Sequence, residues 1–151
     1  MLNYFCLQFD ELSLDQLYDI LRLRQEVFIV EQDCPYLDAD GKDQKSYHVI
    51  GIDQNKKLQA YTRLVPPGIS YEQYVSIGRV VTSSEVRGKG QGSPLMKYSI
   101  RQCQELWPQH KIKISAQVYI TKFYKELGFE KVGEQYLEDD IPHIAMILKN
   151  N

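Results

Sequence analysis

The most informative part of this chain is VSIGRVVTSSEVRGKGQGSP, residues 75–94. Residues 75–82 are rich in β-branched side chains and predict a strand. The glycine-rich run RGKGQG, residues 87–92, follows, and Pro94 suits the first turn of a helix. A loop of this kind binds anions well, because its free N–H groups and the helix dipole both face the bound charge. The stretch therefore predicts a strand, a phosphate-binding loop and a helix.

Two widespread phosphate motifs do not fit this loop. The P-loop requires G-x-x-x-x-G-K-[ST], which the spacing does not match. The dinucleotide fingerprint G-x-G-x-x-G fails because residue 93 is Ser. On the residues alone, a tight strand-to-helix connection without any ligand stays open as the alternative.

The residues at the start of the chain predict a strand and a helix. The strand covers residues 3–9, and the polar, turn-rich segment 33–45 comes after the helix. Ser13 is a good N-cap, with Gln16 three residues later as its capping-box partner. The apolar stripe expected to face the core consists of Leu14, Leu17, Tyr18, Leu21 and Phe28.

The remaining segments complete an α/β pattern. Two β-prone runs, residues 47–53 and 57–65, predict an antiparallel hairpin. The helix that begins near Pro94 is expected to bury Met96, Ile100, Cys103 and Trp107 before Pro108 stops it. The order β-α-β-β-β-α-β-α-β-β predicts a mixed sheet with helices on its faces. The last elements are a strand over 111–118, a short helix that Gly128 ends, and strands over 131–137 and 144–148.

Composition limits the classes of function. The 151 residues suit one domain, residues 1–151, and 18 basic against 20 acidic residues give a net charge of −2. Nucleic acid is therefore not expected as the main partner. No segment reaches the roughly 20 apolar residues of a membrane span, and the start has no basic region of a signal peptide. Three cysteines cannot build a tetrahedral zinc site unaided. We expect a cytoplasmic protein without a metal centre.

The loop residues connect the chain to a known family. RGKGQG fits Q/R-x-x-G-x-G/A, the acyl-CoA pyrophosphate loop of the GNAT N-acetyltransferases, which this chain resembles over nearly its whole length. FY followed by GF, residues 123–129, resembles the C-terminal signature of that superfamily. More narrowly, the chain is similar to ElaA-type proteins, while Ser93-Pro94 departs from the small or apolar residues usual after the loop. The segments that carry this likeness are RxxVFxVEQ (24–32), IGRVV (77–81) and EDDIPH (138–143) with Met146.

The resemblance implies the GNAT fold, a mixed central β-sheet that is splayed between its fourth and fifth strands and has helices on both faces. It also implies acetyl-CoA as cosubstrate, lying between the strands 75–82 and 111–118. The main chain of the first strand would pair with the pantetheine arm, and the loop N–H groups would hold the pyrophosphate. The implied cofactor-binding residues are Val80, Val81, Thr82, Arg87, Gly88, Lys89, Gly90, Gln91, Gly92 and Ser93.

The activity implied is direct transfer of an acetyl group from acetyl-CoA to a primary amine of a small molecule or peptide in a ternary complex. Tyr124 matches the tyrosine that acts as general acid in many GNAT enzymes. The expected substrate-side residues are Glu31, His48 and His143. A general base is also needed, and the residues leave it open among Glu31, Asp38, His48, His143 and a water molecule.

Two readings from other classes stay open. A non-catalytic acyl-CoA-binding or regulatory module would keep the loop and turn nothing over. An interaction domain would use the loop only as a connection. The oligomeric state is also open, a homodimer included. Neither alternative gives the cysteines a catalytic role, and Cys6, Cys34 and Cys103 are expected to be structural or neutral.

Overall fold

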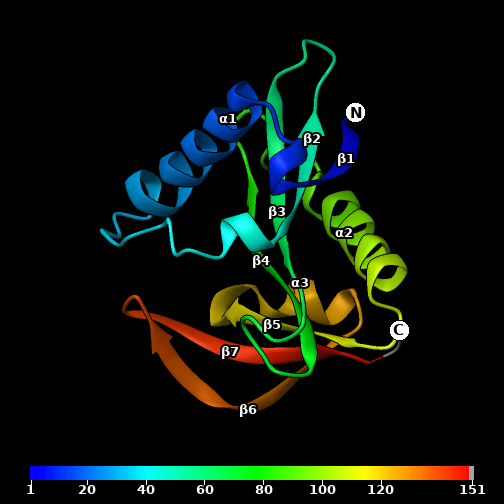
Figure 1. Cartoon of the computed structure of the whole chain (residues 1–151). Helices are drawn as coiled ribbons and strands as arrows, with labels where there is room; N and C mark the ends of the chain where they lie inside the picture. The colour runs from blue at the N-terminus through cyan, green and yellow to red at the C-terminus, as the bar shows by residue number, and fades with distance from the viewer. Residues whose placement is uncertain (150–151) are drawn as a thin grey trace.

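The computed structural model describes residues 1–149. Its elements follow the order expected from the sequence (Figure 1). Within these residues, no helix combines the length and apolar character needed to cross a membrane. The helices are α1 (Leu14–Arg24), α2 (Gly92–Leu106) and α3 (Thr121–Glu126), with a π-helical segment η2 (Gln25–Glu31) and short 3₁₀ turns η1 (Phe9–Glu11), η3 (Asp43–Lys45) and η4 (Val118–Ile120). The strands are β1 (Asn3–Gln8), β2 (Tyr47–Ile52), β3 (Leu58–Val65), β4 (Tyr74–Thr82), β5 (Lys111–Gln117), β6 (Phe129–Glu138) and β7 (Ile141–Leu148).

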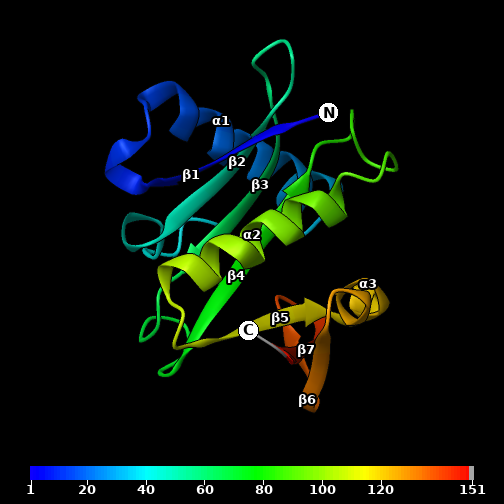
Figure 2. The same cartoon turned by 90° about the vertical axis from the view of Figure 1, so that its right-hand side faces the viewer.

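The seven strands form one mixed sheet in the order β1-β2-β3-β4-β5-β7-β6. Neighbouring strands are antiparallel, apart from the parallel pair β4 and β5. The residue pairs of that parallel ladder are Tyr74 with Lys111 and Val75 with Ile112. Beyond these pairs the two strands part, because β4 continues beside β3 while β5 continues beside β7 (Figure 2). The expected splay between the fourth and fifth strands is confirmed.

Helices α1 and α2 cover opposite faces of the first half of the sheet (Figure 2). Leu64 of β3 and Ile77 of β4 belong to the core cluster under α2. Tyr61 and Val81, from the same two strands, belong to the cluster under α1. The sheet therefore has a packed core on each side, and the cleft between β4 and β5 opens beside both cores.

A β-bulge in β4 explains how one strand serves both cores. Tyr61 opposes Val81, whereas Arg63 opposes Gly78, so three steps along β4 match two along β3. Arg79 lies in this bulge with a φ of 49°. Because side chains alternate along a strand, the extra residue turns the following side chains to the other face. The bulge also bends the strand at the point where it borders the cleft.

The predicted apolar stripe of α1 is partly wrong. Leu14 and Tyr18 are 86% and 69% exposed, and the buried residues of the helix are Ile20, Leu23 and Arg24. The buried face is turned from the predicted stripe by roughly one residue, about 100°. The prediction counted apolar side chains, whereas Arg24 occupies a core position because it is neutralised there by buried aspartates.

The local signals for the helix starts are confirmed. Ser13 caps α1, its hydroxyl accepting a hydrogen bond from the Gln16 amide, and the Gln16 side chain completes the capping box. In α2, Met96 and Cys103 are buried as predicted, while Ile100 and Trp107 are half-buried at the edge of the same core. These signals depend only on neighbouring residues, which is why a sequence reveals them.

Candidate active site

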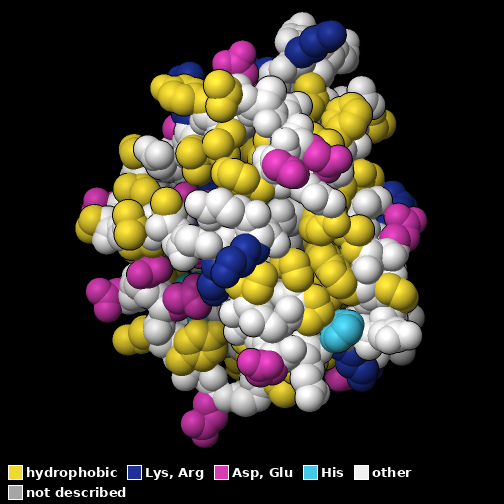
Figure 3. Space-filling model, viewed as in Figure 1, with side chains coloured by type: hydrophobic (Ala, Val, Ile, Leu, Met, Phe, Trp, Pro, Cys, Tyr) yellow, Lys and Arg dark blue, Asp and Glu magenta, His cyan; other side chains and the backbone are white. Residues whose placement is uncertain are grey.

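A cavity of about 410 Å³ lies where β4 and β5 separate. Its walls come from β4 on one side, from β5 and β7 on the other, and from η2 and the segment after it. Charged side chains of both signs lie over this face of the molecule, and acidic ones gather at its left, near the β6–β7 turn (Figure 3). Polar and charged side chains make up most of the cavity lining, and apolar side chains such as Val27, Phe28 and Ile114 fill the rest.

The backbone of β4 is the first functional feature of this cavity. The β3 side of β4 is fully used, since Ala60 pairs with Thr82 and Tyr61 with Val81. On its other side β4 has parted from β5, so its backbone N–H and C=O groups have no strand to pair with there. Val80, Val81 and Thr82 line the cavity along this open edge. An extended ligand with amide groups could therefore pair with β4 as an added strand does.

The glycine loop joins the open edge to α2. Gly88 and Gly90 have φ angles of 80° and 74°, in the left-handed region that favours glycine. A Cβ atom at either position would meet no neighbour within 4 Å, so the loop surface is open. Helix α2 starts at Gly92 and has no side-chain N-cap, which leaves its first N–H groups available to an anion.

Arg87 and Glu31 meet at the mouth of the cavity. The Arg87 Nη1 atom lies 2.7 Å from Oε1 of Glu31, and its Nη2 donates to the carbonyl of Thr82 at 3.1 Å. Both side chains line the cavity and remain part-exposed, at 47% and 38%. The loop cation and the carboxylate expected on the acceptor side therefore form one ion pair.

Tyr124 enters the cavity from α3. Its ring is buried and meets Phe123 and Phe129 edge-on, with centroid distances of 5.2 Å and 5.9 Å. Burial, with a smaller effect of Tyr119, raises the pKa of the Tyr124 phenol to about 12. The phenol therefore keeps its proton at neutral pH, as a general acid must. The packed aromatic ring gives its hydroxyl a fixed position at the cavity wall.

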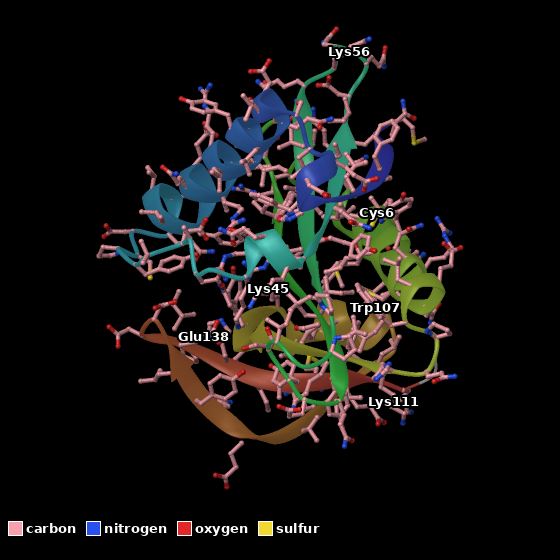
Figure 4. The ribbon with its side chains drawn as sticks, in the orientation of Figure 1. Cys6, Lys45, Lys56, Trp107, Lys111 and Glu138 are labelled. Carbon is pink, nitrogen blue, oxygen red and sulfur yellow. The ribbon has the colours of Figure 1, made fainter. Side chains whose placement is uncertain are left out.

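His143 enters from the start of β7, in the wall opposite β4. Its Nδ1 donates a hydrogen bond to the carbonyl of Ile141 at 2.7 Å. Its Nε2 lies 3.7 Å from Oε2 of Glu138, and its ring stacks on Tyr136. Glu138 ends β6 at the β6–β7 turn, beside the cavity (Figure 4). The sequence motif EDDIPH thus supplies two polar groups to one wall.

Comparison with known proteins agrees with this geometry. The family model described as the acetyltransferase (GNAT) domain matches residues 23–150. The chain belongs to the GNAT family. It is similar to protein ElaA of Escherichia coli strain K12, with 41% identity over 148 residues that cover 97% of this chain and 95% of ElaA. The ElaA-type resemblance expected from the sequence is confirmed.

Two solved structures share the fold of this GNAT protein. An acyl-CoA N-acyltransferase from Pseudomonas aeruginosa superposes with a TM-score of 0.91 and 42% identity, covering 97% of this chain and 99% of that one. The crystal structure of Escherichia coli ElaA gives a TM-score of 0.89 and 40% identity, with the same coverage. The expected GNAT fold is therefore confirmed by both strand topology and superposition.

The structure does not bring His48 to the GNAT cleft. The ring is fully buried between the sheet and the turn η3. The Tyr61 hydroxyl donates to its Nδ1 at 2.6 Å, and its Nε2 donates to the carbonyl of Asp43 at 2.9 Å. Burial lowers the pKa of the imidazole, which favours the neutral form. Its expected place among the substrate-side residues is therefore corrected, because both ring nitrogens are used inside the core.

Asp38 is also committed elsewhere. Its carboxylate accepts hydrogen bonds from Arg24 at 2.8 Å and from Arg79 at 2.7 Å. The Tyr36 hydroxyl donates to the same carboxylate at 3.1 Å. Two guanidinium groups therefore hold this carboxylate, and Asp38 is not among the residues that line the cavity. Of the four candidate bases, Asp38 and His48 therefore act in the framework of this GNAT protein.

A buried charge network beneath the cleft escaped the sequence analysis. Arg24 and Arg63 share the carboxylate of Asp43, each through Oδ1 at 2.9 Å. Arg63 also binds Asp40 at 2.8 Å, and this arginine holds the pKa of the Asp40 carboxyl well below its usual range. The network ties segment 33–45 to the sheet. The three aspartates at short spacing in that segment were the available signal, but nothing local shows which arginines they meet.

Cys34 borders the GNAT cleft, in contrast to the other two cysteines. Its thiol lies 3.4 Å from the carbonyl of Asp139, which joins segment 33–45 to the β6–β7 turn. Cys103 lies on the buried face of α2, and burial raises the pKa of the Cys6 thiol to about 11. Residues 1–149 hold no group of three or more His, Cys, Asp or Glu side chains arranged to bind a metal ion.

Proposed function

We propose that this GNAT protein is an acetyl-CoA-dependent N-acetyltransferase, which moves the acetyl group directly to a primary amine of a small molecule or peptide in a ternary complex. One observation carries the proposal: the phenol of Tyr124, protonated at neutral pH, borders the same cavity as the open edge of β4. An acid for the leaving thiolate and a binding edge for its pantetheine arm thus share one site.

The donor would be held mainly by backbone. The open edge at Val80, Val81 and Thr82 offers N–H and C=O groups to the amides of pantetheine. An N–H group of this edge would also polarise the thioester carbonyl, as in an oxyanion hole. The open surfaces at Gly88 and Gly90 and the uncapped start of α2 suit a pyrophosphate. The residues present therefore fit acetyl-CoA.

The reaction needs one bond formed and one broken. The nitrogen of a neutral amine attacks the thioester carbon, and the C–S bond of the tetrahedral intermediate then breaks. Its electron pair goes to sulfur, and the phenol of Tyr124 gives the thiolate its proton. The nitrogen loses a proton in the same sequence, which returns the phenol to its resting state. The products are an N-acetylated amine and CoA thiol.

The acceptor side favours a cationic amine. Arg87 neutralises Glu31, and Arg79 is bound by Asp38, so the cations of the cavity are already paired. Glu138 and Asp139, from the β6–β7 turn, leave a negative balance at the opposite wall. A protonated amine would be attracted to that wall before it loses its proton.

The test is a screen for release of free thiol from acetyl-CoA. The acceptors are 1,4-diaminobutane, lysine amide, tyramine and a peptide with a free N-terminal amine, with propionyl-CoA as a second donor. We expect thiol release that depends on an amine, and an acetylated product of the matching mass. Tight binding of acetyl-CoA without turnover of any acceptor would favour the non-catalytic module instead. Absence of CoA binding would contradict both.

A further inference from the structure

We propose that His143 is the general base that takes the proton of the acceptor ammonium, and that Glu138 positions and stabilises it. This inference rests on the proposed acetyl transfer and names a residue pair for the step that the proposed function leaves open. The amine must be neutral to attack, but a primary amine with a pKa near 10 is almost entirely protonated at pH 7. A base in the cavity therefore decides how much nucleophile exists.

The hydrogen bond of His143 to Ile141 determines its tautomer. A carbonyl oxygen can only accept, so the Nδ1 atom 2.7 Å away must carry the hydrogen. In the neutral ring the Nε2 atom then has a free lone pair. The Nε2 atom is 3.7 Å from the Glu138 carboxylate, and both residues line the cavity. An ammonium bound at this wall would find a proton acceptor already oriented.

The carboxylate of Glu138 becomes useful when the ring is charged. At 3.7 Å it is too far for a hydrogen bond to a neutral ring, but it attracts an imidazolium. The Ser115 hydroxyl donates to the other carboxylate oxygen, Oε1, at 3.1 Å. The Tyr136 hydroxyl contacts the same serine, and the Tyr136 ring stacks on His143 with centroids 6.2 Å apart. These contacts give the carboxylate and the ring one defined arrangement.

Three strands bring this group together. On β7, His143 is paired with Tyr136 of β6 and with Gln117 of β5. Glu138 stands at the end of the β6 ladder, opposite Ile141. The base is thus built on the strands of the sheet and not on a free loop, which favours precise positioning.

The other candidate bases are engaged by arginines or enclosed in the core. Glu31 is bound by Arg87 at 2.7 Å, and Asp38 is held by Arg24 and Arg79. His48 lies outside the cavity with both nitrogens hydrogen-bonded. Of the two candidates that line the cavity, Glu31 is ion-paired with an arginine, whereas His143 has no arginine partner and faces the Glu138 carboxylate.

The proton balance closes with one proton released. His143 takes one proton from the ammonium, and the neutral amine then forms the C–N bond. The C–S bond breaks, and the thiolate takes the proton of Tyr124. The second proton lost by nitrogen restores the phenol. The imidazolium of His143 gives its proton to solvent beside Glu138, which is part-exposed. The sum is ammonium plus acetyl-CoA giving amide, CoA thiol and one proton.

The test compares His143→Gln and Glu138→Gln with a matched control, Glu134→Gln, which lies on the same strand and outside the cavity lining. The readouts are kcat against pH, for whichever amine of the screen is acetylated, and the Kd of acetyl-CoA by calorimetry. For His143→Gln we expect kcat at pH 7 to fall about 100-fold, the low end of the usual range for a general base. The Kd should be unchanged. The deficit should shrink as pH approaches the pKa of the amine, because a free amine needs no base.

The ionisable groups that face His143 are Glu138 and Tyr136 of β6, while its β5 neighbours Ser115 and Gln117 are uncharged. In Glu138→Gln the imidazolium loses the carboxylate charge beside it, so we expect kcat to drop about fivefold at pH 7. Nitrogen NMR of the histidines provides a readout that does not need turnover. The neutral ring of His143 should be protonated at Nδ1.

The outcomes separate this proposal from the proposed function. If the wild-type protein releases no thiol with any amine, the acetyl transfer fails and the base assignment falls with it. If the wild type is active and His143→Gln keeps the same kcat at every pH, only the base assignment is wrong. A neutral ring protonated at Nε2 would also overturn it. Should His143→Gln not fold, the pH profile and NMR spectrum of Glu138→Gln decide.

Discussion

The guanidinium of Arg87 lies 2.7 Å from the carboxylate of Glu31, across 55 intervening residues of sequence. Arg87 belongs to the loop proposed to hold the donor, and Glu31 ends the π-helical segment on the acceptor side. A pyrophosphate that binds Arg87 would compete with Glu31 for its guanidinium. Since coupling between two ligands is reciprocal, donor and acceptor should each change the affinity of the other.

The first prediction concerns this ion pair. Replacing Glu31 with Gln should tighten CoA binding about two- to fivefold at low salt, because Arg87 would no longer have to give up its ion pair with Glu31 to bind the pyrophosphate. The gain should shrink at high salt, since both side chains are part-exposed and screened. Calorimetry with CoA measures it. Glu26→Gln is the matched control, because Glu26 pairs with Arg22 on the exposed side of the helix. Weaker binding in Glu31→Gln would contradict the exchange.

The second prediction tests the glycine loop. Gly90→Glu should abolish CoA binding, because it adds a side chain and a negative charge where the phosphates would approach. The left-handed φ of 74° should also cost about 1–2 kcal/mol of folding stability. Gly68→Glu is the control: its φ of 92° and its open surroundings produce the same strain away from the loop. CoA affinity that survives in folded Gly90→Glu would remove the loop from the site.

The third prediction separates acid catalysis from packing at Tyr124. Tyr124→Phe keeps the ring and its contacts with Phe123 and Phe129, so acetyl-CoA binding and the melting temperature should change little. The value of kcat should fall about 10- to 100-fold, less than for many general acids because a CoA thiolate is a fair leaving group. With a pKa of about 12, the wild-type phenol stays protonated up to pH 10, so the loss should not vary with pH below that value.

The control for this prediction is Tyr18→Phe, because Tyr18 lies on α1, is 69% exposed and is not part of the cavity lining. It should leave kcat unchanged. A lower melting temperature with wild-type turnover in Tyr124→Phe would assign the phenol to packing instead.

The fourth prediction concerns acid stability. Arginines lower the pKa of Asp40 and of Asp43 in the folded protein, so folding stability from these ion pairs is present above the ordinary carboxyl pKa. This stability should be lost as pH falls below about 4, because the carboxyls then bind protons in the unfolded chain but stay ionised in the folded protein. Urea unfolding between pH 7 and pH 3 measures this slope.

The matched variants for that slope are Asp43→Asn and Asp19→Asn. Removing the Asp43 carboxylate leaves Arg24 and Arg63 short of one shared partner, so we expect about 3–5 kcal/mol of destabilisation and a shallower pH dependence. Asp19 is an exposed residue of α1, so Asp19→Asn should change the free energy of unfolding by less than about 0.5 kcal/mol. Equal slopes in Asp43→Asn and the wild type would show that the buried network is not the source.

Local patterns were enough to predict the helices, the strands and the glycine loop, while the splay of the sheet was implied by the family resemblance. Each of these patterns depends only on residues that are close in sequence. Examples are the Ser13 cap, the glycines of the loop and the alternation of buried side chains along β5. The strand order follows from short connections and from the family resemblance carried by RGKGQG. These features do not depend on which side chains of distant segments pair with each other.

Contacts between distant segments decided the rest. The partner of each candidate base is one that no local pattern specifies: Arg87 for Glu31, Arg24 and Arg79 for Asp38, and Tyr61 for His48. The same long-range pairing buries Arg24 and so turns the core face of α1 away from its most apolar stripe. A charged side chain can be buried only beside a partner of opposite charge, and these partners come into contact only when the sheet has assembled.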